Sequence, residues 1–177
     1  MLNPKTNLFL NQAMVWGGIS GAIISIYMLI HNASGNVNEG LQTTGFIQYI
    51  ILSFGIYFCQ RNYCRRVESQ EDAKLGKLFL LGIVCGLAAS IIIALYISYF
   101  IKVNPEVVNQ AMKQSQEILK EMKMYQPEEL ERASEISKKI FSPALIIGNT
   151  IAYIVISAFF SAFSTLLCYL NRIKNAK

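Results

Sequence analysis

Long uncharged apolar runs alternate with polar stretches along this chain. Four intervals contain no Asp, Glu, Lys, Arg or His. A helix that crosses a hydrocarbon core of about 30 Å needs about 20 mostly apolar residues, and it satisfies its backbone hydrogen bonds within the segment. The pattern therefore predicts an all-α membrane protein with four transmembrane helices, at 8–30, 41–58, 78–101 and 144–170. The interval 41–58 is the least apolar of the four, since it contains Gln42, Thr43, Thr44 and Gln48.

The segment 102–143 is the one long charged stretch between the predicted spans. Asn104, Pro105 and Glu106 are typical of a helix start, with Pro at the first helical position. Apolar residues then recur at helical spacing up to Tyr125, and Pro127 begins a second such stretch that ends before Ser142 and Pro143. We expect an amphipathic helical hairpin, after which Pro143 starts the last span. The whole chain, 1–177, is expected to be a single four-helix transmembrane domain with 102–143 as an extracytoplasmic insertion.

Lysine and arginine are distributed unequally between the two sides of the predicted membrane. One side has nine basic and three acidic residues, and the other has seven basic and eight acidic residues. Because cytoplasmic loops carry the excess of Lys and Arg, both termini and the middle loop are expected in the cytoplasm. The basic residues expected to anchor this side at anionic headgroups are Arg61, Arg65, Arg66, Lys74 and Lys77.

Small residues recur every four positions in three of the predicted spans. The first contains Gly17, Gly21 and Ser25, the third contains Gly82, Gly86 and Ser90, and the fourth contains Ser157 and Ser161. Such stripes let membrane helices approach closely. We interpret them as helix packing within the bundle or as the seam of an oligomer, and both interpretations stay open at this point.

The composition excludes several classes of protein. Apolar residues make up 53% of the chain and charged residues 15%, whereas a soluble domain has about 25% charged residues. No Asp, Glu, Lys, Arg or His lies inside a predicted span, although such groups usually mark proton relays and ion pathways. We expect no enzymatic activity, no cofactor, no metal and no nucleic-acid partner. Cys59, Cys64, Cys85 and Cys168 lie on the cytoplasmic half, where disulfides are rare, and are expected as small apolar filler.

The chain resembles the bacterial domain of unknown function 4199 family. The resemblance rests on the glycine-rich stretch 16–21, on Gly55 and Ile56 before the basic loop, on the stretch 75–82 and on the stretch 101–105. It implies a small four-span inner-membrane protein. It implies no catalytic residue.

Three hypotheses about function remain. The first is a non-enzymatic interaction protein or accessory subunit of the bacterial inner membrane, which binds lipid and either a second copy or another membrane protein. The alternative is a small-solute channel or facilitator formed by oligomerisation and lined by Asn11, Gln12, Gln48, Asn149 and the serines of the spans. A third is a sensor whose basic loop, from Cys59 to Lys77, binds anionic lipid.

Overall fold

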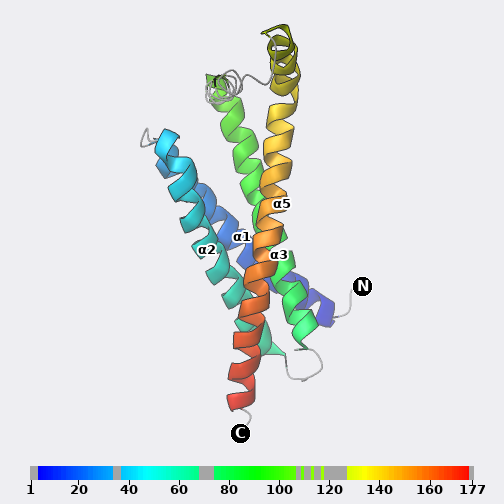
Figure 1. The fold of residues 1–177 in the computed structure, drawn as a ribbon. Helices are drawn as coiled ribbons and strands as arrows, with labels where there is room; N and C mark the ends of the chain where they lie inside the picture. The colour runs from blue at the N-terminus through cyan, green and yellow to red at the C-terminus, as the bar shows by residue number, and fades with distance from the viewer. Residues whose placement is uncertain are drawn as a thin grey trace. The chain divides into compact units, whose positions relative to one another are not determined.

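The computed structural model describes residues 4–33, 37–67, 74–106, 109, 113, 117 and 127–175. The four long helices in this part of the chain are α1 (Pro4–Ala33), α2 (Val37–Arg66), α3 (Leu75–Val103) and α5 (Pro127–Asn175) (Figure 1). They confirm the predicted all-α class. The chain divides into two compact units, one formed by Met1–Ile93 with Thr150–Lys177 and the other by Ala94–Asn149. We call them unit 1 and unit 2. The prediction of a single domain with an insertion at 102–143 stays a prediction.

Three of the helices are long and apolar enough to cross a membrane. Among the described residues these stretches are Asn7–Asn32, Leu75–Val103 and Pro143–Asn171, and they contain the predicted spans 8–30 and 78–101 and the span 144–170. The predicted span 41–58 lies inside α2, which is not among the three. Polar residues at its start and the sequence from Gln60 to Arg66 lower its apolar character. The fourth span therefore stays a prediction.

Helices of unit 1 that follow one another in the chain run in opposite directions. The Phe9 ring of α1 packs edge-on against Tyr63 of α2, and Trp16 stacks on Phe58 with 5.5 Å between the ring centroids. Residue numbers thus rise along α1 as they fall along α2, so these two helices are antiparallel.

The other two helices follow the same alternation. Gly82 of α3 faces Ser161 of α5, and Gly86 faces Ser157, so α3 and α5 are antiparallel. Gly17 and Gly21 of α1 face successively later residues of α3, so α1 and α3 run in parallel. The start of α1, the end of α2, the start of α3 and the end of α5 therefore share one end of unit 1 (Figure 1).

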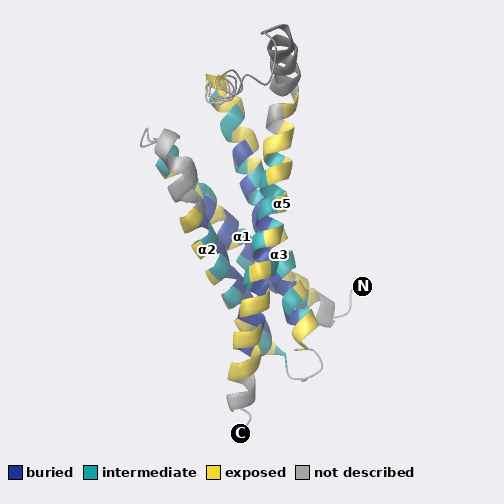
Figure 2. Ribbon diagram, viewed as in Figure 1, coloured by how far each residue is buried: buried dark blue, intermediate teal, exposed yellow. Residues whose placement is uncertain are grey.

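The interior of unit 1 contains small and polar side chains beside large apolar ones such as Leu52 and Leu81, and many other large apolar side chains face outward. Ser157, Ser161 and Gln60 are fully buried, whereas Phe159 is 73% exposed and Met14 is 61% exposed. In Figure 2 the buried positions lie where the helices face one another. Soluble proteins rarely expose large contiguous apolar patches, whereas membrane helices place small residues at their contacts. This arrangement is that of a multi-pass membrane protein.

The helix α5 continues through Pro143 without a break. The prediction that one helix ends before Ser142 and a new one starts at Pro143 is therefore wrong. Proline in a helix interior removes the hydrogen bond to the carbonyl four residues earlier, here that of Lys139. Such a loss often kinks or ends a helix, but the long apolar stretch that follows Pro143 continues the same helix.

Unit 2 contains the part of the predicted hairpin that the structure describes. Pro105 and Glu106 are helical, as are positions 109, 113 and 117, and the remainder of 107–126 lies outside the described residues. The backbone N–H of Asn104 donates to the Phe100 carbonyl at 2.9 Å, and its side-chain amide donates to the same oxygen at 3.1 Å. Asn104 thus gives the Phe100 carbonyl, at the end of α3, both a backbone bond and a side-chain bond.

Candidate functional site

The glycines of α1 form a close contact with the backbone of α3. A methyl group at Gly17 would lie 2.7 Å from the Ala88 Cβ and would overlap the carbonyl oxygen of Cys85. At Gly21 it would lie 2.8 Å from the carbonyl oxygen of Ala89. Real Cβ atoms do not approach other atoms this closely, so only glycine permits this approach of the two helices.

The glycines of α3 make the equivalent contact with α5. A methyl group at Gly82 would lie 2.6 Å from the Ser161 Cβ, and one at Gly86 would overlap the Ser157 side chain. The Ser157 hydroxyl donates to the Tyr153 carbonyl at 2.6 Å, which satisfies it within its own helix. The α3–α5 contact is therefore glycine on one helix against serine on the other.

The last residue of each predicted glycine triplet bonds within its own helix. The Ser25 hydroxyl donates to the Gly21 carbonyl at 2.8 Å, and the Ser90 hydroxyl donates to the Leu87 carbonyl at 2.8 Å. The glycines make the close contacts between helices, and the hydroxyls of these serines are satisfied within their own helices. The glycine faces thus meet neighbouring helices of the same chain, and the seam of an oligomer stays a prediction.

A third close contact, between α1 and α2, was not among the predicted packing residues. A methyl group at Gly55 of α2 would overlap the Ser20 hydroxyl of α1. That hydroxyl donates to the Trp16 carbonyl at 2.8 Å. With the two contacts above, every helix of unit 1 contributes to at least one glycine-based contact.

Gln60 lies at the junction of α2, α3 and α5 and is fully buried. Its amide nitrogen is 2.9 Å from the Leu78 carbonyl oxygen, 2.9 Å from the Ser161 hydroxyl and 3.1 Å from the Thr165 hydroxyl. The Ser161 hydroxyl donates in turn to the Phe79 carbonyl at 2.8 Å. The two N–H groups of one amide thus connect α2 to both other helices.

The hydrogen bonds of Gln60 were not predicted from the sequence, because the predicted second span ended at Phe58. Gln60 was consequently placed in a loop beside Arg61. The available signal was the helical spacing of Ile56 and Tyr63, which are both buried and lie four positions before and three after Gln60. This spacing continues the buried face of α2 past the predicted end of the span.

The residues of unit 1 that were proposed to line a pore, Asn11, Gln12 and Gln48, do not share one surface. The Gln48 side-chain oxygen accepts a hydrogen bond from the Tyr153 hydroxyl of α5 in the interior. Asn11 is exposed and lies near Phe9, level with the end of α2, about four turns along α2 from Gln48. Gln12 is buried, and Asn149 belongs to unit 2. Gln48 is thus a packing residue between α2 and α5.

The structure brings the four cysteines together in two pairs. Cys59 is in side-chain hydrogen-bond contact with Cys85, and Cys64 with Cys168. All four are free thiols. From the sequence, all four cysteines were predicted to be small apolar filler. The pairing could not be predicted, because the two cysteines of each pair lie on different helices. Among the described residues no group of three or more His, Cys, Asp or Glu side chains could hold a metal ion.

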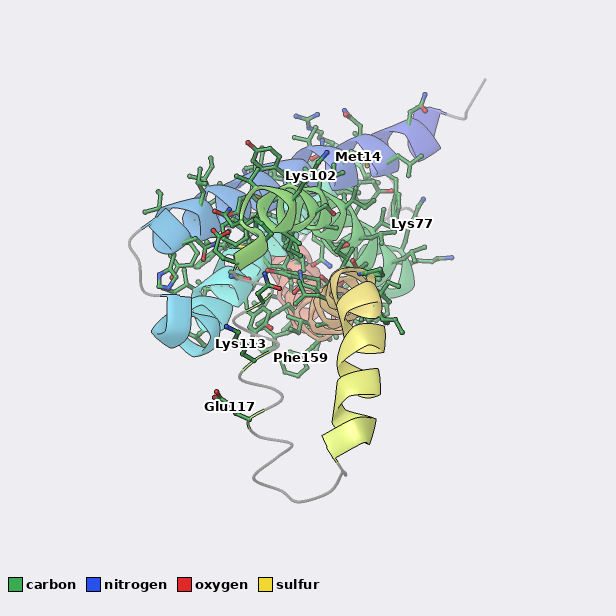
Figure 3. The ribbon with its side chains drawn as sticks, turned by 90° about the horizontal axis from the view of Figure 1, so that it is seen from above. Met14, Lys77, Lys102, Lys113, Glu117 and Phe159 are labelled. Atoms are coloured by element: carbon green, nitrogen blue, oxygen red, sulfur yellow. The ribbon has the colours of Figure 1, made fainter. Side chains whose placement is uncertain are left out.

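The basic residues gather at the end of unit 1 where both chain termini lie. Arg61, Arg65, Arg66 and Lys74 are exposed, and Lys77 is half-buried. The Arg61 guanidinium lies 5.9 Å from the centre of the Tyr57 ring, a cation–π arrangement. In Figure 3 the molecule is seen from above, with Lys77 and Phe159 labelled; Phe159 lies on the outer side of α5.

Comparison with known proteins places the chain in a family. No curated protein and no solved structure matches it. The family described as "Protein of unknown function (DUF4199)" matches residues 15–167. This range includes all the glycine-based contacts described above and Gln60. Since the match covers most of the chain, the protein belongs to the DUF4199 family.

Proposed function

We propose that the protein is a four-span integral protein of the bacterial inner membrane that acts by binding rather than by catalysis. Its partners are membrane lipid and either a second copy of the chain or another inner-membrane protein. In this proposal α2 is the fourth span, and the end of unit 1 that carries both chain termini lies in the cytoplasm.

The contact between α1 and α2 supports α2 as a span. Aromatic pairs join the two helices at Phe9 with Tyr63 and at Trp16 with Phe58, and the Gly55 contact lies one turn further along. These contacts fall within Asn7–Asn32, the apolar stretch of α1. A helix that follows a membrane-crossing neighbour over this length occupies the same hydrocarbon layer.

The basic end of unit 1 supports the orientation. Arg65 and Arg66 lie in the last turn of α2, and Lys74 and Lys77 flank the start of α3. All lie at the end that the start of α1 and the end of α5 share. The excess of Lys and Arg at one end favours placing that end in the cytoplasm.

The binding role is supported by the fact that the polar groups and glycine faces inside unit 1 are already occupied by neighbouring helices. The buried amides of Gln48 and Gln60 are engaged by side chains of α5, and the glycine faces are occupied by neighbouring helices. What unit 1 presents outward is apolar, as at Phe159, Met14 and Phe54. An apolar exterior supports contact with lipid chains and with other membrane helices, where packing drives association.

Purification from native membranes tests the binding role. We expect tagged protein in mild detergent to elute with a stoichiometric partner, either a second copy or another membrane protein, identified by mass and by peptide sequencing. A stable monomer that carries only lipid, under conditions that preserve a known complex of the same membrane, would contradict the proposal.

A reporter that is active only outside the cytoplasm tests the topology. Fused after Ala33 it should be active, whereas fused after Val67 it should be inactive, because α2 would return the chain to the cytoplasm. Activity at both positions would show that α2 does not cross. These fusions leave the binding role untouched, so the two parts of the proposal fail separately.

A further inference from the structure

The two cysteine pairs join helices that are far apart in the sequence. Cys59 and Cys64 both lie on α2, and their partners lie on α3 and α5 respectively. Gln48 and Gln60 of α2 bond to Tyr153 and Thr165 of α5, so these two helices run in parallel. Cys64 and Cys168 lie one turn after Gln60 and Thr165, which places them side by side. A contact between two thiols brings their sulfur atoms within reach of each other, and an S–S bond needs such proximity before it can form. Each pair is therefore a potential cross-link within one chain.

Exposure separates the two pairs. Cys59 and Cys85 are both fully buried, and Cys168 is 6% exposed. Cys64 is only half-buried, and it lies one turn after Arg61, which is exposed. One pair is thus enclosed on both sides, whereas the other has one sulfur that a small polar reagent can reach.

The geometry points to Cys64 and Cys168 as a dithiol that closes reversibly into a disulfide between α2 and α5 when it meets a hydroperoxide. Cys64 is the thiol that reacts first, because it is the accessible one. Cys168 is the resolving thiol, because it is in contact with Cys64 and shielded from the reagent. Disulfides of this kind in reducing compartments are transient and sense redox state.

The reaction balances with hydrogen peroxide as the oxidant. The Cys64 thiol loses its proton, and the thiolate sulfur attacks one peroxide oxygen. The O–O bond breaks to give a sulfenic acid and hydroxide, and the hydroxide takes up the released proton to become water. The Cys168 sulfur then attacks the sulfenic sulfur, the S–O bond breaks, and the oxygen leaves as a second water with the remaining thiol proton. The two sulfurs together lose the two electrons that the peroxide gains. Exchange with a dithiol reductant restores both thiols.

The disulfide would fix the last turn of α2 to the last turns of α5. Arg65 and Arg66 follow Cys64 directly, so the cross-link acts on the basic end of unit 1. Oxidation would thereby restrain the part of the molecule that the proposed function places at the cytoplasmic surface. The cross-link itself does not depend on that orientation.

Trypsin digestion of peroxide-treated membranes tests this inference. Cleavage after Lys and Arg places the four cysteines on four different peptides, with Cys64 on Asn62–Arg65 and Cys168 on Ile140–Arg172. Membranes that contain the full chain are treated with hydrogen peroxide, blocked with N-ethylmaleimide and digested without reductant. We expect mass spectrometry to find these two peptides joined, and dithiothreitol to separate them.

The buried pair is the matched control. Changing Cys59→Ala together with Cys85→Ala should leave the cross-link in place, whereas Cys64→Ser or Cys168→Ala should abolish it. Linkage of the Cys59 and Cys85 peptides to the same extent would overturn the inference, as would a link between Cys64 residues of two chains. Cys64 that is oxidised or blocked by maleimide with no link to Cys168 would overturn it as well.

Discussion

At the scale of single residues, two adjacent glycines of α1 have opposite surroundings. A methyl group at Gly17 would collide with Cys85 and Ala88, whereas at Gly18 it would meet only the end of the Ile92 side chain, at 3.8 Å. Gly17→Ala should therefore destabilise the protein by about 1–3 kcal/mol, the usual cost of overpacking. Gly18→Ala should stabilise it by up to about 1 kcal/mol, because alanine favours the helix. Unfolding of the purified variants in detergent measures both, and equal effects would show that α1 and α3 are not in contact there.

Gln60 is the residue at which hydrogen bonding rather than size decides the outcome. Gln60→Leu removes the amide but leaves the Ser161 hydroxyl bonded to the Phe79 carbonyl, so we expect a loss of about 1–2 kcal/mol. Gln60→Glu replaces a donor by an acceptor among oxygen atoms of Leu78, Ser161 and Thr165. It should cost more than Gln60→Leu, because a buried ionised group without a partner is strongly unfavourable. If the unfolding measurements rank the two variants in the reverse order, the amide does not serve as the donor.

At the scale of helices, how much the sequence predicted depends on whether the signal is local. The runs that became α1, α3 and α5 were recognisable because the absence of charge over a span is a local property. The contact of Gln60 with Ser161 joins residues 101 positions apart, and no local pattern encodes it. The spacing of the glycines was recognisable in the sequence, but the sequence did not indicate which helix would pack against each set. Pro143 was misread because a local helix breaker was outweighed by the apolar stretch that follows it.

The position of α2 in the membrane can be tested with two residues of equal exposure. Ile50 and Phe58 are each 39% exposed, but Ile50 lies near the middle of the predicted span and Phe58 at its end. Ile50→Lys should cost about 2.5–3.5 kcal/mol of membrane insertion. Phe58→Lys should cost less, even with the loss of its contact with Trp16, because a lysine near a span end extends its charge to the interface. Insertion is measured with the reporter after Val67, and equal tolerance of both lysines would place α2 outside the hydrocarbon.

At the scale of the whole molecule, the fold links the packing of the helices to their orientation. Because helices of unit 1 that follow one another in the chain alternate in direction, the basic residues beside α2 and α3 fall at the end of the bundle where α1 begins and α5 ends. The interior contacts of glycine, serine and glutamine hold the four helices together whichever way the bundle faces. The distribution of Lys and Arg at the ends therefore has to set the orientation.

Because the interior contacts hold the bundle together and the charges at its ends set its orientation, the orientation can be changed without changing the fold. Replacing Arg65, Arg66, Lys74 and Lys77 by Gln removes most of the positive charge beside α2 and α3, and none of these side chains contributes to the glycine contacts. We expect a mixed or inverted topology, seen as loss of activity of the reporter after Ala33, with unchanged unfolding of the purified protein. Replacing the same residues by the other basic type, Arg65→Lys and Lys74→Arg for example, is the matched control and should keep the original orientation, because the rule counts positive charge. If the Gln variant keeps the wild-type topology, an element other than these four residues sets the orientation of the bundle.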